Sequence, residues 1–304
     1  MFKLLFLLLM EVCVFSQQKS DEEILKEILV KHNLSISDFT VYRSRIKIPL
    51  DYSYQPNLWY MIEDNKVKML RISSGSLTQI SLSGLTNLKK LDLNYSNITE
   101  LKLYNLPNLK ELDLGWNTGL TQIDLSGLTN LEKLNLSECN ITNLSLSKLP
   151  PNLKELDLAW NTGLTQIDLS GLTKLEKLNL SWSNITDLSL SKLPKNLKEL
   201  NLAWNTRLNR INLSGLTKLE KLDLSWCKIS DLSLLKLPQN LKEINLANNR
   251  DLTQLNLSGL TRLEKLGLTN CWNLKEIILS KYVKDKINIQ SIAGELDKVN
   301  IIWK

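Results

Sequence analysis

Leucines recur in a fixed register from Val67 to about residue 283 of the 304-residue chain. Ten units begin at Val67, Leu88, Leu109, Leu131, Leu153, Leu175, Leu197, Leu219, Leu241 and Leu263, in two steps of 21 residues and seven of 22. We number the positions of a unit as columns, with these residues in column 1, and leucine dominates columns 1, 4 and 6. Because so short a unit cannot bury its own leucines, the repeat predicts a solenoid whose stacked coils share one core.

The pattern within each unit predicts two extended segments. Apolar columns 4 and 6 flank one outward residue, which is the period of a strand, and stacked coils then form a parallel sheet at roughly 4.8 Å per coil. A second alternating string, such as Ile167 to Leu169, predicts another extended segment on the opposite side. Asparagines in column 9 are expected to turn inward and bond backbone groups of neighbouring coils. These asparagines are Asn117, Asn161, Asn205 and Asn249.

The units are of two kinds that alternate, so the duplicated element is about 44 residues long. One kind reads LEKLxLSxx(N/K)I and occupies 131–152, 175–196 and 219–240. The other kind reads LKELxLAWNTxL or a close variant and occupies 109–130, 153–174, 197–218 and 241–262.

The first sixteen residues have the pattern of a secretory signal peptide. Lys3 provides the basic start, residues 4–10 the apolar stretch, and Ser16 the end of a small-residue cleavage site. The apolar stretch is shorter than the roughly 20 residues that span a bilayer. We therefore expect export with no integral membrane segment after signal removal, and lipid attachment at Cys13 stays open.

The segments on either side of the repeat do not share its register and are predicted to cap the solenoid. Residues 17–66 are expected to form a small α/β N-terminal cap, with a helix over 21–34 that has Asp21 as its N-cap. A short strand is expected within 42–50. The repeats then occupy 67–284, and residues 285–304 close the other end as a C-terminal cap.

The pattern L-x-x-L-x-L-x-x-(N/C)-x-L resembles the leucine-rich repeat family, with ten successive matches over 67–283. The period of 21–22 residues and the doubled L-x-L resemble bacterial secreted and surface members, internalin-like in style. The resemblance implies a right-handed leucine-rich repeat solenoid with a parallel β-sheet on the concave face and short extended segments on the convex face. It also implies that partners, usually proteins, bind the concave sheet.

Charge and cysteine usage narrow the function. Lys and Arg number 38 against 32 Asp and Glu, and the net charge of +6 is spread through alternating signs, which argues against a nucleic-acid partner. Cys139, Cys227 and Cys271 all occupy column 9. The closest pair is two coils apart, about 10 Å, which exceeds the roughly 7 Å limit for a disulfide. We expect free structural thiols.

The sequence contains no pattern typical of an enzyme. His32 is the only histidine, so it lacks a companion for a zinc site or a nucleophile–base pair. The SGL triplets repeat as turns rather than forming a phosphate-binding loop. We therefore predict no catalytic residues, no metal site and no cofactor.

Outward columns of the concave sheet carry the candidate binding residues. Columns 2 and 3 alternate Lys and Glu between coils, so Glu176 should lie beside Lys198 and Lys177 beside Glu199. Column 5 is Asp or Asn in eight coils, and its candidate ligand-binding acids are Asp113, Asp157 and Asp223. Column 7 is small. Column 8, which we call the aromatic column, holds Tyr95, Trp116, Trp160, Trp182, Trp204 and Trp226.

The aromatic column has two interpretations at this stage. It is either a ladder that stacks on itself or a ligand platform whose ring faces are left open by small column 7 residues. The favoured function is an exported protein-binding or adhesion module, secreted or at the cell surface, in the periplasm or on the outer surface of a Gram-negative cell. The alternative is a carbohydrate-binding surface that uses the tryptophans. A purely structural coat protein is a third and less favoured interpretation.

Overall fold

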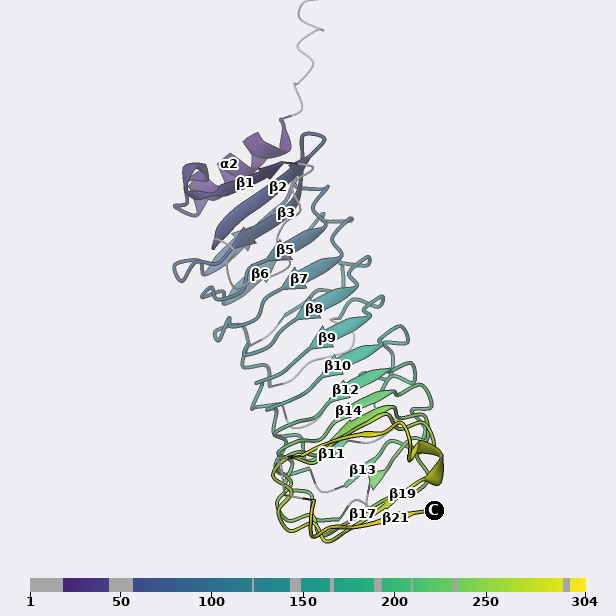
Figure 1. Ribbon diagram of the computed structural model, residues 1–304. Helices are drawn as coiled ribbons and strands as arrows, with labels where there is room; N and C mark the ends of the chain where they lie inside the picture. The colour runs from purple at the N-terminus through teal and green to yellow at the C-terminus, as the bar shows by residue number, and fades with distance from the viewer. Residues whose placement is uncertain are drawn as a thin grey trace, which may run out of the picture.

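The structure is a computed structural model in which coils stack into a long solenoid (Figure 1). It describes residues 19–43, 57–121, 123–142, 149–164, 167–188, 193–208, 210–231, 235–291 and 296–304. The signal peptide expected at 1–16 lies outside the described residues, as does most of the strand expected within 42–50.

One long sheet runs the length of the solenoid and contains thirteen strands among the described residues. Its neighbouring strands are parallel except for the antiparallel pair β2 and β3. In the repeats each strand covers columns 3 to 5, and Leu178 is in register with Leu156 and Leu200. The strands are β1 Thr40–Arg43, β2 Leu58–Glu63, β3 Lys66–Ile72, β5 Lys90–Asp92, β7 Glu111–Asp113, β8 Lys133–Asn135, β9 Glu155–Asp157, β10 Lys177–Asn179, β12 Glu199–Asn201, β14 Lys221–Asp223, β16 Glu243–Asn245, β18 Lys265–Gly267 and β20 Asn288–Gln290.

The second extended segment forms shorter parallel sheets away from the long one in the first two units and in the units from Leu175 onward. They pair β4 with β6, join β11, β13 and β15, and join β17, β19 and β21. Their bounds are β4 Gln79–Ser81, β6 Glu100–Lys102, β11 Asp187–Leu188, β13 Arg210–Asn212, β15 Leu235–Lys236, β17 Gln254–Leu257, β19 Glu276–Leu279 and β21 Asn300–Trp303. The predicted solenoid, with a concave parallel sheet and short extended segments opposite it, is confirmed.

The leucines of columns 1, 4 and 6 fill the space between these sheets. In the coil that begins at Leu175, the side chains of Leu175, Leu178 and Leu180 are all buried. The buried residues of successive coils form one continuous hydrophobic cluster from the N-terminal helix to Val283. Each coil therefore depends on its neighbours for burial, as the repeat length requires.

Column 9 forms a buried ladder beneath the concave sheet. The Asn205 Nδ2 donates to the carbonyl oxygens of Leu180 and Leu202 at 2.8 Å each. Its Oδ1 accepts from the Ile185 N–H at 2.8 Å, so one amide serves two coils. Asn117, Asn161 and Asn249 make the equivalent bonds.

The column 9 cysteines are buried free thiols, as predicted. The Cys139 Sγ donates to the Leu114 carbonyl oxygen at 3.1 Å, and the Cys227 Sγ to that of Leu202 at 3.2 Å. Burial raises the pKa of both thiols to about 12. Their environment therefore holds them in the unreactive protonated form.

A helix, α2 (Asp21–Lys31), covers the N-terminal end of the solenoid (Figure 1). It is followed by the 3-10 helix η1 (Ile36–Asp38). The expected N-cap is wrong by one residue, because Ser20 caps the helix in a capping box with Glu23. Asp21 is instead buried and accepts from the Val67 N–H at 3.1 Å, which ties the helix to the first coil. Leu25 and Leu29 are fully buried on the helix face that the spacing predicted.

At the other end, the 3-10 helix η6 (Lys281–Val283) leads into β20, which pairs with β18 in the long sheet. The last strand, β21, pairs with β19 on the opposite side. The C-terminal residues thus continue both sheets by one strand. Across the ranges described here, no helix is long and apolar enough to cross a membrane.

Candidate functional site

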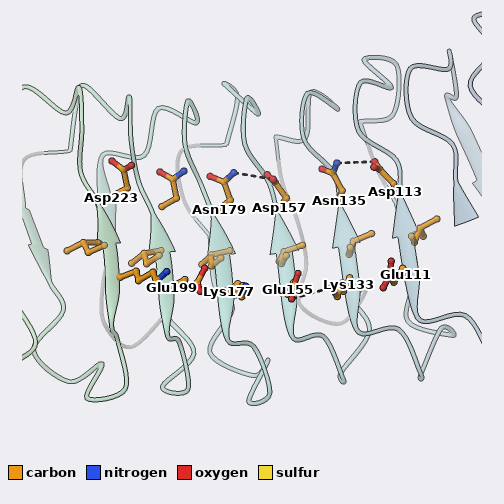
Figure 2. Close-up of a pocket in the computed structure, with 18 of the residues that line it drawn as sticks. Glu111, Asp113, Lys133, Asn135, Glu155, Asp157, Lys177, Asn179, Glu199 and Asp223 are labelled. Carbon is orange, nitrogen blue, oxygen red and sulfur yellow. Dashed lines mark hydrogen bonds and ion pairs between the residues drawn. The ribbon is translucent and has the colours of Figure 1, made fainter. Parts of the chain in front are cut away.

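A polar groove runs along the concave sheet from Arg71 to Gln290. Figure 2 shows its central part, where the side chains of columns 3 and 5 form two parallel rows on successive strands. The rows arise because strand residues alternate in direction, so the column 4 leucine between them points into the core.

The column 3 row and the adjacent column 2 row are ladders of ion pairs. The Lys177 Nζ lies 3.6 Å from the Glu199 Oε1, and the Lys198 Nζ lies 2.9 Å from the Glu176 Oε1. The charge alternation predicted between coils is therefore confirmed. Because these side chains are about half exposed, each pair contributes roughly 0–1 kcal/mol. Their main effect is to balance charge along the groove.

The column 5 row holds Asp113, Asp157 and Asp223, and its oxygens are used within the fold. The Asp157 Oδ1 accepts from the Ala159 N–H at 2.9 Å, which starts the turn after the strand. Its Oδ2 accepts from the Asn179 Nδ2 on the next strand at 3.1 Å, and Asp223 bonds Asn245 in the same way at 3.0 Å. Each of these three carboxylates is followed by an Asn on the next strand, because an amide can donate to the neighbouring carboxylate whereas a second carboxylate cannot.

At the N-terminal end of the row two carboxylates are neighbours, because Asp92 and Asp113 lie side by side on paired strands. Burial, and then the neighbouring Asp92 charge, raise the pKa of Asp113 to about 6. Burial also raises the pKa of Asp92, although the Arg71 guanidinium 3.4 Å away partly opposes that shift. Both burial and a neighbouring carboxylate therefore disfavour the ionised form of Asp113.

The aromatic column lies beside the groove, in the turn that follows each strand, and of its six residues Tyr95 is the one that lines the groove. Its six residues all have left-handed backbone, with φ between 51° and 63°. That region costs a bulky residue roughly 1–2 kcal/mol. The backbone bonding of the sheet nevertheless continues through the turn, as the Trp182 N–H donates to the Ala203 carbonyl oxygen at 3.0 Å.

The rings of the aromatic column stack on one another in two groups. Trp160, Trp182, Trp204 and Trp226 form one group, with centroid distances of 4.1, 3.9 and 4.1 Å and interplanar angles of 11° to 16°. Tyr95 and Trp116 form the other, at 5.0 Å. The expectation that small column 7 residues leave the ring faces open is wrong, because the strand spacing of about 4.8 Å is close to a stacking distance. Trp182 and Trp204 have a neighbouring indole on both faces, whereas Trp116 and Trp160 have an aromatic neighbour on one face only among the described residues.

Two features of this side of the groove were not identified from the sequence. Glu138 occupies column 8 between the two groups, with φ of 54°. At the other end, the Arg250 guanidinium lies 5.9 Å from the Trp226 ring and 4.5 Å from the Trp272 ring, between the two. An alignment of the units places Glu138 in the aromatic column, but Arg250 and Trp272 are in column 10, so the columns alone could not bring them together.

Several solved structures resemble this chain. The internalin InlF of Listeria monocytogenes is 25% identical, with 75% of this chain and 86% of that chain covered and a TM-score of 0.40. TLR13, in a complex with ssRNA13, is 26% identical, with 75% and 40% covered and a TM-score of 0.53. InlJ of Listeria monocytogenes, whose functional domain includes a cysteine ladder, is 20% identical, with 79% and 64% covered and a TM-score of 0.43. No curated protein sequence matches the chain.

Family models agree with the register of the repeats. The model described as leucine-rich repeats in two copies matches residues 86–128, 107–150 and 151–193. The model described as a leucine-rich repeat matches residues 215–237. These matches cover residues 86–193 and 215–237 and fall within the stacked coils whose columns, buried ladder and parallel sheet are described above, so these coils are leucine-rich repeats.

Proposed function

We propose that the chain is an exported, non-enzymatic module that binds a protein partner through its concave face. The observation that carries the proposal is the continuous polar groove, which has the aromatic column beside it and is built on a rigid parallel sheet. Solenoids use such extended concave surfaces for binding. Exposed Tyr and Trp beside a polar surface are also the residue types that most often become energetic hot spots at protein interfaces.

The chemistry of this surface favours a protein over a carbohydrate. A sugar ring stacks on an open aromatic face, but Trp182 and Trp204 each have neighbours on both faces. The carboxylate of Asp157 already accepts two hydrogen bonds from the fold. What the groove offers is a long row of short polar groups beside indole edges, which matches the mixed polar and aromatic composition of protein interfaces.

The exported location rests on the signal peptide expected at 1–16, and we place the mature chain outside the cytoplasm, secreted or on the cell surface. In the same proposal, residues 17–66 form the N-terminal cap, 67–284 the repeats and 285–304 the C-terminal cap. The groove lies almost wholly within the repeats, so the caps support binding indirectly by closing the ends of the core.

The proposal can be tested with two matched pairs of amide substitutions. Asn179→Arg with Asn201→Arg places two bulky cations in the groove, and Asn212→Arg with Asn256→Arg places them on the opposite face. All four asparagines accept a hydrogen bond from the N–H two residues later, but Asn179 also donates to Asp157, so the stability of both double variants would be measured before their affinities are compared.

The full chain and both double variants would be screened on arrays of purified extracellular proteins and of glycans, and affinities measured for any hit. We expect a protein that binds the parent chain and the convex variant alike, with at least tenfold weaker binding to the groove variant. Equal binding by both variants, or binding to glycans alone, would contradict the proposal.

A further inference from the structure

The aromatic column is interrupted at one coil, the one that begins at Leu131. There Glu138 takes the place that tryptophan holds in the four coils that follow. Its backbone keeps the geometry of the column, with φ of 54° and an N–H that donates to the Ala159 carbonyl oxygen at 2.9 Å. The Glu138 side chain therefore projects from the same row as the rings, between Trp116 and Trp160.

The interruption leaves two ring faces without an aromatic neighbour. Trp116 stacks on Tyr95 only and Trp160 on Trp182 only, among the residues that the structure describes. These two rings are 44% and 40% exposed, and the three tryptophans further along are less exposed. Two coils separate them, about 10 Å of sheet, so one planar group fits between them. We call this space the ladder gap: the Trp116 face, the Trp160 face and Glu138.

The molecule itself shows what fills such a space. At the other end of the aromatic column, the Arg250 guanidinium lies between the rings of Trp226 and Trp272, at 5.9 and 4.5 Å from their centroids. A guanidinium is planar and weakly hydrated, so it stacks readily on indole faces. The ladder gap has the same pair of indole faces and, in addition, a carboxylate. No hydrogen bond or ion pair joins that carboxylate to another described residue.

We propose that the ladder gap binds an arginine side chain of a protein partner, with the guanidinium between Trp116 and Trp160 and paired with Glu138. The inference rests on the proposed protein-binding function and names the group that the partner supplies. Charge complementarity decides the occupant: a carboxylate beside two indole faces attracts a cation by ion pairing and by the ring quadrupoles together. A neutral sugar or a neutral aromatic side chain would leave the Glu138 charge partly desolvated and unpaired.

The first test uses a blocked tripeptide, Gly-Arg-Gly, and the same peptide with neutral citrulline in place of arginine. The full chain would carry ¹⁵N-labelled tryptophan, and the indole N–H resonances would be followed by NMR during titration. We expect the arginine peptide to shift Trp116 and Trp160 while Trp182 and Trp204 stay in place, and the citrulline peptide to act several-fold more weakly. Equal effects of the two peptides, shifts centred on Trp182 and Trp204, or no shift at all would overturn the inference.

Three variants make the test specific to the ladder gap. Glu138→Gln removes the charge and should weaken the arginine peptide by about two- to fivefold. Glu138→Trp inserts the missing ring, which should abolish binding of the peptide and leave the fold intact, because tryptophan already occupies this turn in neighbouring coils. Arg250→Ala opens the space between Trp226 and Trp272, and the peptide should then also shift these two resonances. Undiminished binding to the Glu138→Trp variant would exclude the ladder gap as the site.

The same variants separate this inference from the proposed function. If a protein partner binds the parent chain and the Glu138→Trp variant equally, the concave face still binds protein but the ladder gap plays no part. If the arginine peptide binds the ladder gap and no protein partner depends on the groove, the cation site stands and the proposed function fails.

Discussion

Columns 8 and 9 are neighbours in the chain, and both form ladders along the solenoid, but opposite forces determine their residues. Asn205 in column 9 is buried and satisfies backbone groups of two coils, so few other residues could replace it. Trp204 in column 8 satisfies no such need and adopts a backbone conformation that disfavours bulky residues. A residue that the fold requires says little about function, whereas one that the backbone disfavours calls for another explanation.

The sharpest test of this contrast is Asn205→Leu, which we expect to have the largest effect on stability. The substitution leaves the Ile185 N–H and the Leu180 carbonyl without a buried partner, at about 1–3 kcal/mol for each orphaned group, while the Leu202 carbonyl keeps the Cys227 Sγ as a donor. We expect a loss of about 3 kcal/mol or more in the free energy of unfolding, measured by urea denaturation. Asn212→Leu, an exposed amide on the opposite face, is the control and should change little.

A smaller effect on stability is expected when Trp182 and Trp204 are both replaced by Asn. The change removes three stacked pairs, each worth about 0.5–1.5 kcal/mol, but it relieves left-handed strain of about 1–2 kcal/mol per bulky residue. We expect a net loss of about 1 kcal/mol or less. Partner affinity should fall at least about a hundredfold, as for paired hot spots. The denaturation midpoint and the partner affinity would both be measured on this double variant. A loss of stability with unchanged affinity would mean that the aromatic column has a purely structural role.

Cys139→Ser should be milder still, because a hydroxyl can donate to the Leu114 carbonyl as the Ser183 hydroxyl donates to that of Leu158. We expect a loss under about 1 kcal/mol in the free energy of unfolding. In the parent chain, the buried thiols should react with iodoacetamide only after denaturation. A Cys227–Cys271 disulfide found by mass spectrometry would contradict the register of column 9.

The smallest effect is expected for Glu176→Ala in the exposed charge ladder. Its partner Lys198 lies 2.9 Å away, but both side chains are nearly half exposed, so solvent screens the pair. We expect under about 1 kcal/mol, decreasing with added salt. A loss as large as that of Asn205→Leu would mean that the exposed and buried columns have been assigned the wrong way round.

The period of the repeat was sufficient to predict the register, the leucine core, the inward asparagines and the second extended segment. These features follow from which residues fall in the same column, and the period determines that directly. The left-handed turn at Trp204 and the N-cap at Ser20 depend on local backbone conformation, which a column alignment does not contain. The stacking of the rings depends on a distance between coils, and the known strand spacing could have predicted it.

The ladder gap illustrates the remaining limit. Glu138 stands in the aromatic column of the sequence, so the interruption is visible there. The structure was needed to show that Trp116 and Trp160 each have an aromatic neighbour on one ring face only, among the described residues. The comparison with Arg250 also needed the structure. Arg250 and Trp272 are in column 10 and Trp226 is in column 8, so an alignment by column does not show that Arg250 contacts both rings.

The alternation of the two unit kinds restricts how the solenoid can change in length. Each column 9 asparagine of one kind accepts from the coil before it, which is of the other kind, as Asn161 accepts from the Ile141 N–H. Removing residues 153–174 alone would set Lys133 against Lys177 and leave Ile141 facing Ser183 in place of the asparagine. Removing 153–196 would instead set Lys133 against Glu199 and place Asn205 opposite Ile141, which preserves the charge ladder and the column 9 bonds. The array should therefore grow or shrink in steps of two coils, and its reach along a partner should vary in increments of about 10 Å.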